Sequence, residues 1–180
     1  MSEKIIFIGD SITEAFDVKK HLSEFNIINK GIYGDNTMGV LKRVDSDIIN
    51  LNPDKVFILI GTNDFALNRT PEELIETYEQ IIKKIIAHIN STDIYITSIL
   101  PTRNIENRPI EIIKKANSCL FNLAQKYNLN YFDLFSELAD NEEQINERYT
   151  TDGLHLSEEG YQKWAEIFKH KFRDLINNRH

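Results

Sequence analysis

The chain has 180 residues, of which 41% are hydrophobic and 27% charged, and it carries a formal net charge of -7 at pH 7. A globular composition at this length predicts a single domain, residues 1–180, with an apolar core of its own. The acidic balance argues against nucleic acid or an anionic membrane surface as the main partner.

Strand-like and helix-like segments alternate along the whole chain. Short β-rich segments predict strands at Lys4–Ile8, Asn26–Asn29, Lys55–Ile60, Asp93–Ser98 and Asn130–Asp133. Apolar residues at helical spacing predict helices at Ile12–Glu24, Thr37–Asn50, Pro71–Asn90, Pro109–Tyr127 and Glu158–Asn177. This alternation predicts an α/β protein whose parallel sheet has helices on both faces.

A candidate nucleophile follows the first predicted strand. The apolar run Ile5–Ile8 stops at Gly9, and Asp10 and Ser11 then lead into a helix. A strand-to-helix turn is where open α/β sheets present ligand-binding groups, and a helix N-terminus favours developing negative charge. The competing interpretation is that Asp10 or Ser11 only caps the helix.

A serine hydroxyl needs a base within hydrogen-bond reach, and the base needs a group that orients it. His155 is the best base in the sequence, because it lies in a predicted loop while the other histidines lie in predicted helices or at the chain end. Asp152, three residues earlier, can accept a hydrogen bond from its ring. A metal site built on these two residues would need more ligands, so no metal is expected.

Acyl transfer also needs donors for the oxyanion of the transition state. Gly34 offers an unhindered backbone N–H, and Asn63 offers a side-chain amide after the third strand. The backbone N–H of Ser11 is a third candidate. Taken singly, Gly34 and Asn63 are more typical of turn or cap residues. Together with Ser11 and His155, they lie in polar loops that the parallel sheet gathers at one edge.

Two further expectations concern location and the cysteine. No apolar run approaches the roughly 18 residues of a spanning helix, and no leader precedes the first strand, so a cytoplasmic protein without stable membrane insertion is predicted. The single cysteine, Cys119, excludes an internal disulfide and lies on a predicted apolar helix stripe. It is therefore interpreted as a packing residue and not as a nucleophile.

Four sequence blocks resemble the motifs of the SGNH (GDSL-type) hydrolases. They are G-D-S-I-T at 9–13, G-x-x-G-D at 31–35, G-T-N-D at 61–64 and D-G-L-H at 152–155. Their order matches the family from near the first residue to the last helix. The resemblance implies a three-layer α/β/α, flavodoxin-like fold with five parallel strands. It also implies Ser11 as nucleophile, Asp152 and His155 as its triad partners, and Gly34, Asn63 and the Ser11 N–H as oxyanion donors.

The resemblance is strongest to the branch of platelet-activating-factor acetylhydrolase-like and sugar-ester acetylesterases. It implies a small-molecule ester substrate and no cofactor; a short, acetyl-like acyl group is expected because no long insertion supplies a lid. Candidate pocket residues are Ile32, Tyr33, Met38, Phe65, Leu67 and Leu154. A lysophospholipase, an acyl-thioesterase and an inactive flavodoxin-like binding module remain alternatives, and the oligomeric state is left open. No phosphate-loop motif supports nucleotide binding.

Overall fold

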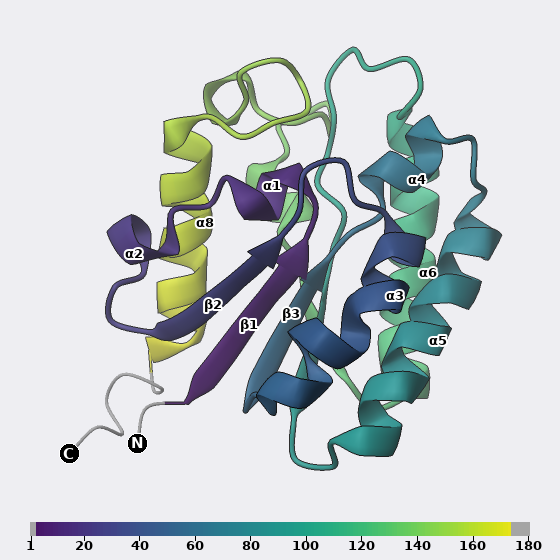
Figure 1. Ribbon diagram of the computed structural model, residues 1–180. Coiled ribbons are helices and arrows are strands. Elements are labelled where there is room, and N and C mark those ends of the chain that lie inside the picture. The colour runs from purple at the N-terminus through teal and green to yellow at the C-terminus, as the bar shows by residue number, and fades with distance from the viewer. Residues whose placement is uncertain (1–2, 174–180) are drawn as a thin grey trace.

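The central sheet has five strands, all parallel, in the order β2-β1-β3-β4-β5 (Figure 1). The computed structural model describes residues 3–173. The strands are β1 (Lys4–Gly9), β2 (Asn26–Gly31), β3 (Lys55–Leu59), β4 (Asp93–Thr97) and β5 (Asn130–Phe132). The predicted parallel α/β sheet is confirmed.

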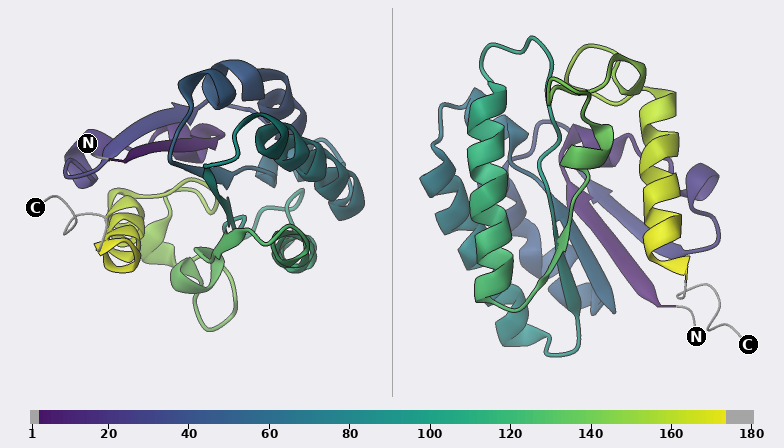
Figure 2. Two further views of the ribbon diagram at one scale, coloured as in Figure 1. Left: turned by 90° about the horizontal axis from the view of Figure 1, so that it is seen from below. Right: turned by 180° about the vertical axis from the view of Figure 1, so that it is seen from behind.

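Helices cover both faces of this sheet, which makes three layers (Figure 2). The α-helices are α1 (Ser11–Glu14), α2 (Val18–His21), α3 (Thr37–Asp47), α4 (Thr62–Ala66), α5 (Pro71–His88), α6 (Ile110–Lys126), α7 (Phe135–Leu138) and α8 (Glu158–Lys171). Two 3₁₀ turns, η1 (Ile49–Leu51) and η2 (Glu147–Tyr149), complete the described elements. Within residues 3–173, none of these helices has the length and apolarity to cross a bilayer.

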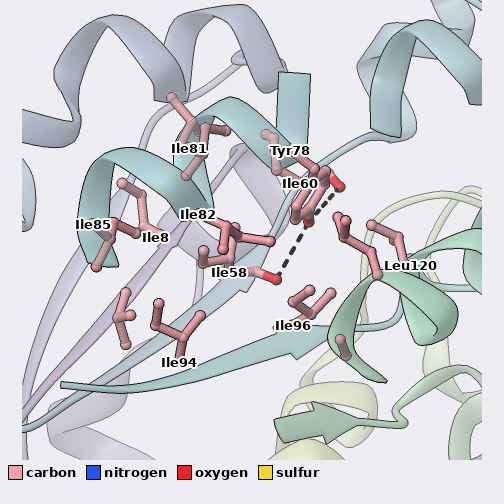
Figure 3. Close-up of a cluster of buried hydrophobic side chains, with 14 of the residues drawn as sticks. Ile8, Ile58, Ile60, Tyr78, Ile81, Ile82, Ile85, Ile94, Ile96 and Leu120 are labelled. Atoms are coloured by element: carbon pink, nitrogen blue, oxygen red, sulfur yellow. Dashed lines mark hydrogen bonds between the residues drawn. The ribbon is translucent and has the colours of Figure 1, made fainter. Parts of the chain in front are cut away.

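The core has two halves because successive side chains of a strand point to opposite faces. On one face, Ile6 and Ile8 of β1 pack with the buried residues of α3, α5 and α6. Figure 3 shows part of this half, in which the Tyr78 hydroxyl donates to the β3-end carbonyl of Ile60 at 3.1 Å. On the other face, the Phe7 ring stacks on Trp164 of α8, with ring centroids 5.9 Å apart.

The helix predicted over Ile12–Glu24 is wrong, because α1 ends after one turn and α2 is a separate helix. The Asn29 amide of β2 donates to the carbonyls of Thr13 at 2.7 Å and Phe16 at 3.0 Å. A continuous helix would use these carbonyls for its own i to i+4 bonds. Asp17 then starts α2 afresh by capping the N–H of Lys20.

Smaller differences concern helix ends and short helices. The helix predicted at Thr37–Asn50 ends at Asp47 and continues as η1. In the helix predicted at Glu158–Asn177, α8 ends at Lys171, and residues 174–177 lie outside the described part of the chain. The short helices α4 and α7 were not predicted; α4 occupies the segment expected to be the G-T-N-D loop.

Candidate active site

Ser11 is the first residue of α1, directly after β1 and the capping residue Asp10. The Asp10 carboxylate accepts the Ile12 N–H at 2.9 Å, so the capping interpretation is right for Asp10 and leaves the Ser11 side chain free for chemistry. Gly9 is required before this turn. A Cβ there would lie 2.2 Å from Thr13 Oγ1 and 2.3 Å from the Leu59 carbonyl oxygen.

His155 reaches Ser11 from a bend that precedes α8, across 144 residues of sequence. The distance from Ser11 Oγ to His155 Nε2 is 3.2 Å. The bend is fixed by Thr150, whose hydroxyl donates to the His155 carbonyl at 2.8 Å and accepts the Gly153 N–H at 2.8 Å. Gly153 has φ 86°, and a Cβ there would lie 2.2 Å from the Arg103 carbonyl oxygen, so only glycine lets this bend pack so closely.

Asp152 contacts the other side of the His155 ring. Its Oδ2 lies 2.7 Å from Nδ1, while its Oδ1 accepts the N–H groups of Leu154 at 2.9 Å and His155 at 2.7 Å. Burial raises the pKa of Asp152, but the hydrogen bonds from the His155 ring and from these N–H groups outweigh it and bring the pKa to about 2. An ionised carboxylate only accepts, so Nδ1 carries the proton and Nε2 can take one from Ser11.

The segment of Gly34 lies beside the serine turn through two sets of contacts. Arg43 of α3 donates from Nε to Asp35 Oδ2 at 2.8 Å and from Nη2 to the Gly9 carbonyl at 3.0 Å. Asn63 of α4 donates from Nδ2 to the Asp35 carbonyl at 2.9 Å. Gly34 itself has φ 71° and open space where a Cβ would be. Both candidate oxyanion donors thus flank Asp35.

Asp64, next to Asn63, is fully buried and fixes α4 against α3. Its carboxylate accepts the Thr37 N–H at 3.0 Å and the Thr37 hydroxyl at 2.5 Å, and it pairs with Arg69 at 2.5 Å. Because Thr37 begins α3, these bonds hold the segment after Gly34 at a set distance from Asn63. Neither Asp64 nor Arg69 was predicted to be a site residue.

A second carboxyl group, that of Asp10, lies beside Ser11. Burial raises the pKa of Asp10 to about 7, against the opposing effects of the Ile12 N–H and of His155. Near neutral pH this carboxyl is therefore partly protonated and adds less than a full negative charge next to Ser11. Its side chain lines a small cavity together with Ile12 and Leu154, two apolar residues around the serine turn.

Apart from Leu154, which lines this cavity, the expected pocket residues divide into two groups. Phe65 is buried in the core and does not line the site, which corrects its assignment. Ile32, Tyr33, Met38 and Leu67 are exposed apolar side chains, and Tyr33 is 77% exposed, so it stands in solvent and closes no pocket. A larger hollow of the molecule lies elsewhere, between β5 and the C-terminal half of α8.

Within residues 3–173, no group of three or more histidine, cysteine, aspartate or glutamate side chains is placed to bind a metal ion. Cys119, the one cysteine, is half-buried on α6 and unpaired by any disulfide.

Comparison with solved structures shows the same fold in known proteins. A Streptococcus pneumoniae protein described provisionally as a platelet activating factor is 32% identical, with a TM-score of 0.85 over 98% of this chain and 85% of that chain. A GDSL-like lipase from Bacteroides thetaiotaomicron is 27% identical, with a TM-score of 0.82 over 96% of this chain and 88% of that chain. These likenesses support the three-layer fold across the described chain.

Sequence comparison gives a curated relative and a family. N-acylneuraminate cytidylyltransferase of Escherichia coli O18:K1:H7 is 31% identical over 166 residues, which is 87% of this chain and 37% of that protein. The chain thus spans little more than a third of that relative. The sequence profile of the GDSL-like lipase/acylhydrolase family matches residues 7–163. Because this match runs from β1 into α8, the chain belongs to the GDSL-like lipase/acylhydrolase family.

Proposed function

We propose that this chain, as a single catalytic domain of residues 1–180, is a serine esterase that hydrolyses short-chain acyl esters, above all acetyl esters. The observation that carries the proposal is the run of contacts from Ser11 Oγ to His155 at 3.2 Å and from His155 to Asp152 at 2.7 Å. Membership of a family of lipases and acylhydrolases supports ester hydrolysis as the reaction class.

In the first half of the reaction, Ser11 Oγ attacks the ester carbonyl carbon while its proton passes to His155 Nε2. The carbonyl π electrons move to oxygen and form a tetrahedral oxyanion. This intermediate collapses by breaking the bond to the alcohol oxygen, which takes the proton from Nε2. The products of this half are a free alcohol and an acyl ester on Ser11.

In the second half, His155 Nε2 takes a proton from water as the water oxygen attacks the acyl carbon. Collapse returns the proton to Ser11 Oγ and releases the carboxylic acid. Throughout both halves, Asp152 stabilises the imidazolium that forms at His155 and keeps the ring in one orientation. The Ser11 N–H, the Gly34 N–H and the Asn63 amide are the proposed donors to the oxyanion.

Asn63→Ala is expected to lower kcat by roughly 10²- to 10³-fold with little change in KM, because an oxyanion donor acts mainly in the transition state. Steady-state kinetics with p-nitrophenyl acetate measure this. Asn141→Ala, at an exposed asparagine distant in sequence, is the control and keeps wild-type kcat. A change confined to KM would show that Asn63 binds the substrate uniformly and does not stabilise the oxyanion.

The proposed preference for short acyl groups rests on the loops at this edge. Asp10 is the only residue between β1 and α1, and two residues separate β3 from α4. These two connections are too short to cover Ser11. Each methylene that a pocket buries contributes about 0.8 kcal/mol, so a preference for long acyl chains requires an extended apolar wall. The Tyr33 and Leu67 side chains are 77% and 60% exposed, so most of their surface is in water.

The substrate test is a series of p-nitrophenyl esters from acetate to octanoate, each below its aggregation concentration. We expect kcat/KM to be highest at about two to four acyl carbons and to fall with length, because added methylenes remain in water. A kcat/KM that rises steadily to eight carbons contradicts this and favours the lysophospholipase or acyl-thioesterase alternative.

The alcohol side of the ester is examined with acetylated sugars under the same conditions. The curated relative is named for N-acylneuraminate, an acylated sugar acid, which supports sugar esters as the first candidates. Release of acetate from an acetylated sugar at a higher kcat/KM than from p-nitrophenyl acetate is the expected result. No turnover of any ester would favour the inactive binding module.

A further inference from the structure

The Arg108 side chain contacts Asn63, one of the proposed oxyanion donors. It lies in the segment that joins β4 to α6, just before the first residue of α6. Its Nη2 donates to Asn63 Oδ1 at 3.0 Å, and its Nε donates to the Thr62 carbonyl at 3.1 Å. One guanidinium therefore holds both the backbone and the side chain at the start of α4.

The segment that carries Arg108 is itself anchored. The Thr102 hydroxyl donates to the Arg108 carbonyl at 2.7 Å, and the Arg108 N–H donates to the Ile105 carbonyl at 3.0 Å. The Arg103 N–H donates to the Gly153 carbonyl at 2.8 Å, which joins this segment to the bend of His155. These hydrogen bonds hold in place the loop that carries the Arg108 side chain.

These contacts determine which way the Asn63 carboxamide faces. A guanidinium only donates, so it must meet the amide oxygen, and the Asp35 carbonyl only accepts, so it must meet the amide nitrogen. A flipped amide would place a donor against a donor and an acceptor against an acceptor. With Oδ1 and one N–H engaged in this way, the second N–H of Nδ2 is left for another acceptor.

The charge of Arg108 strengthens this arrangement. A hydrogen bond from an ionised donor is roughly twice as strong as a neutral one, and it polarises the amide so that its N–H groups become better donors. The Arg108 side chain is half-buried near Asp10 of the serine turn. This burial lowers the pKa of Arg108, and the Asp10 carboxylate opposes the shift. Arginine remains charged in this setting.

We propose that Arg108 is a positioning residue, which orients and polarises the Asn63 amide so that its second N–H points to the oxyanion. This inference rests on the proposed function, because it acts through Asn63 as an oxyanion donor. It assigns the loop before α6 a part in catalysis that none of the four motif blocks contains. Lysine at this position has one ammonium group and cannot hold the Thr62 carbonyl and Asn63 Oδ1 in the same fork geometry.

The test is a double-mutant cycle with Asn63→Ala and Arg108→Ala, measured as kcat and KM for p-nitrophenyl acetate. Arg108→Ala is expected to lower kcat by about ten- to hundredfold with KM little changed, the range of loss when an orienting partner is removed. In the Asn63→Ala background, the same change is expected to lower kcat by less than about twofold, because the amide it orients is gone. Arg108→Lys is expected to fall between wild type and Arg108→Ala.

Added methylguanidinium is a second readout. It is expected to restore part of kcat to Arg108→Ala and none to the double mutant. Glu106→Ala, at an exposed residue of the same loop, is the control and keeps wild-type kcat. Thermal unfolding followed by circular dichroism verifies that each variant folds, and Arg108→Gln takes the place of Arg108→Ala in the cycle if the latter does not.

The outcomes separate the inference from the function on which it rests. An unchanged kcat in Asn63→Ala removes the oxyanion role of Asn63 and the positioning role of Arg108 together. A large loss in Asn63→Ala, combined with an equal Arg108→Ala loss in both backgrounds, overturns the inference alone, because Arg108 then acts on the loop and not through the amide. An Arg108→Ala effect on KM only also overturns it.

Discussion

Ser11→Ala is expected to reduce the turnover of p-nitrophenyl acetate by on the order of 10⁶-fold and to abolish labelling by a fluorophosphonate probe. The probe reacts only with an activated hydroxyl: Oγ forms a bond to phosphorus and fluoride leaves. Ser11 Oγ lies 3.2 Å from His155 Nε2, so the base that would activate it is in place. His155→Ala is expected to lose nearly as much, since the members of a triad act as a unit.

Two controls make this result specific to the nucleophile. Ser118→Ala removes an exposed serine of α6 and is expected to keep both labelling and turnover. Cys119→Ser, also on α6, tests the one competing soft nucleophile and is expected to change neither. Labelling that persists in Ser11→Ala, or that disappears in Cys119→Ser, would refute the assignment of Ser11.

Sequence patterns predicted β1 and β3 well because these strands are buried on both sides. The sequence segments that begin at Lys4 and Lys55 are almost wholly apolar. They form β1 and β3, two adjacent strands in the interior of the sheet. The position of Ser11 at this edge followed from the parallel order of the strands, which puts all their carboxyl ends on one side. The return of the His155 loop to the same edge was expected only for a continuous sheet, which the structure has. The same reasoning places Asn63 at that edge, although on a helix and not in a loop.

The features that the sequence patterns did not predict depend on hydrogen bonds between segments that are far apart in the sequence. The apolar spacing from Ile12 onward is that of one helix, but Asn29 takes two of its carbonyls and splits it. The residue pattern around Phe16 gives no sign of this contact, because Asn29 lies on β2, further along the chain. Arg108 is similar: its loop has no motif, and its contact with Asn63 joins residues 45 positions apart. The one local signal was a polar side chain two residues before the start of α6.

The two halves of the proposed site are held by different contacts. Gly34 is exposed, and its neighbour Asp35 is fixed through Arg43 and Asn63. The His155 side chain is 39% exposed and depends on the carboxylate of Asp152 and on the Thr150 contacts. The orientation of the base is therefore the feature of this site that one atom change can most directly disturb.

Asp152→Asn tests that orientation. Oδ1 of Asp152 already accepts two backbone N–H groups, so an asparagine keeps its carbonyl oxygen there and turns its NH₂ toward His155 Nδ1. The ring must then accept at Nδ1 and carry its proton on Nε2, which is the wrong tautomer for taking the serine proton. We expect kcat to fall by on the order of 10⁴-fold with the fold intact.

The measurement is kcat for p-nitrophenyl acetate across pH, with Asp17→Asn as the isosteric control because asparagine caps α2 about as well as aspartate. The pKa of Asp152 is lowered to about 2, so its carboxyl group stays ionised as pH rises. It becomes protonated, and loses its negative charge, only as pH falls through that value. The carboxylate is therefore ionised at both pH 6 and pH 8, and an Asp152→Asn loss is expected at both values. A loss of less than about tenfold would reduce the proposed triad to a Ser11–His155 dyad. In that case the hydrogen bonds from the Leu154 and His155 N–H groups would hold the bend, and the carboxylate would not be needed to direct the proton of His155.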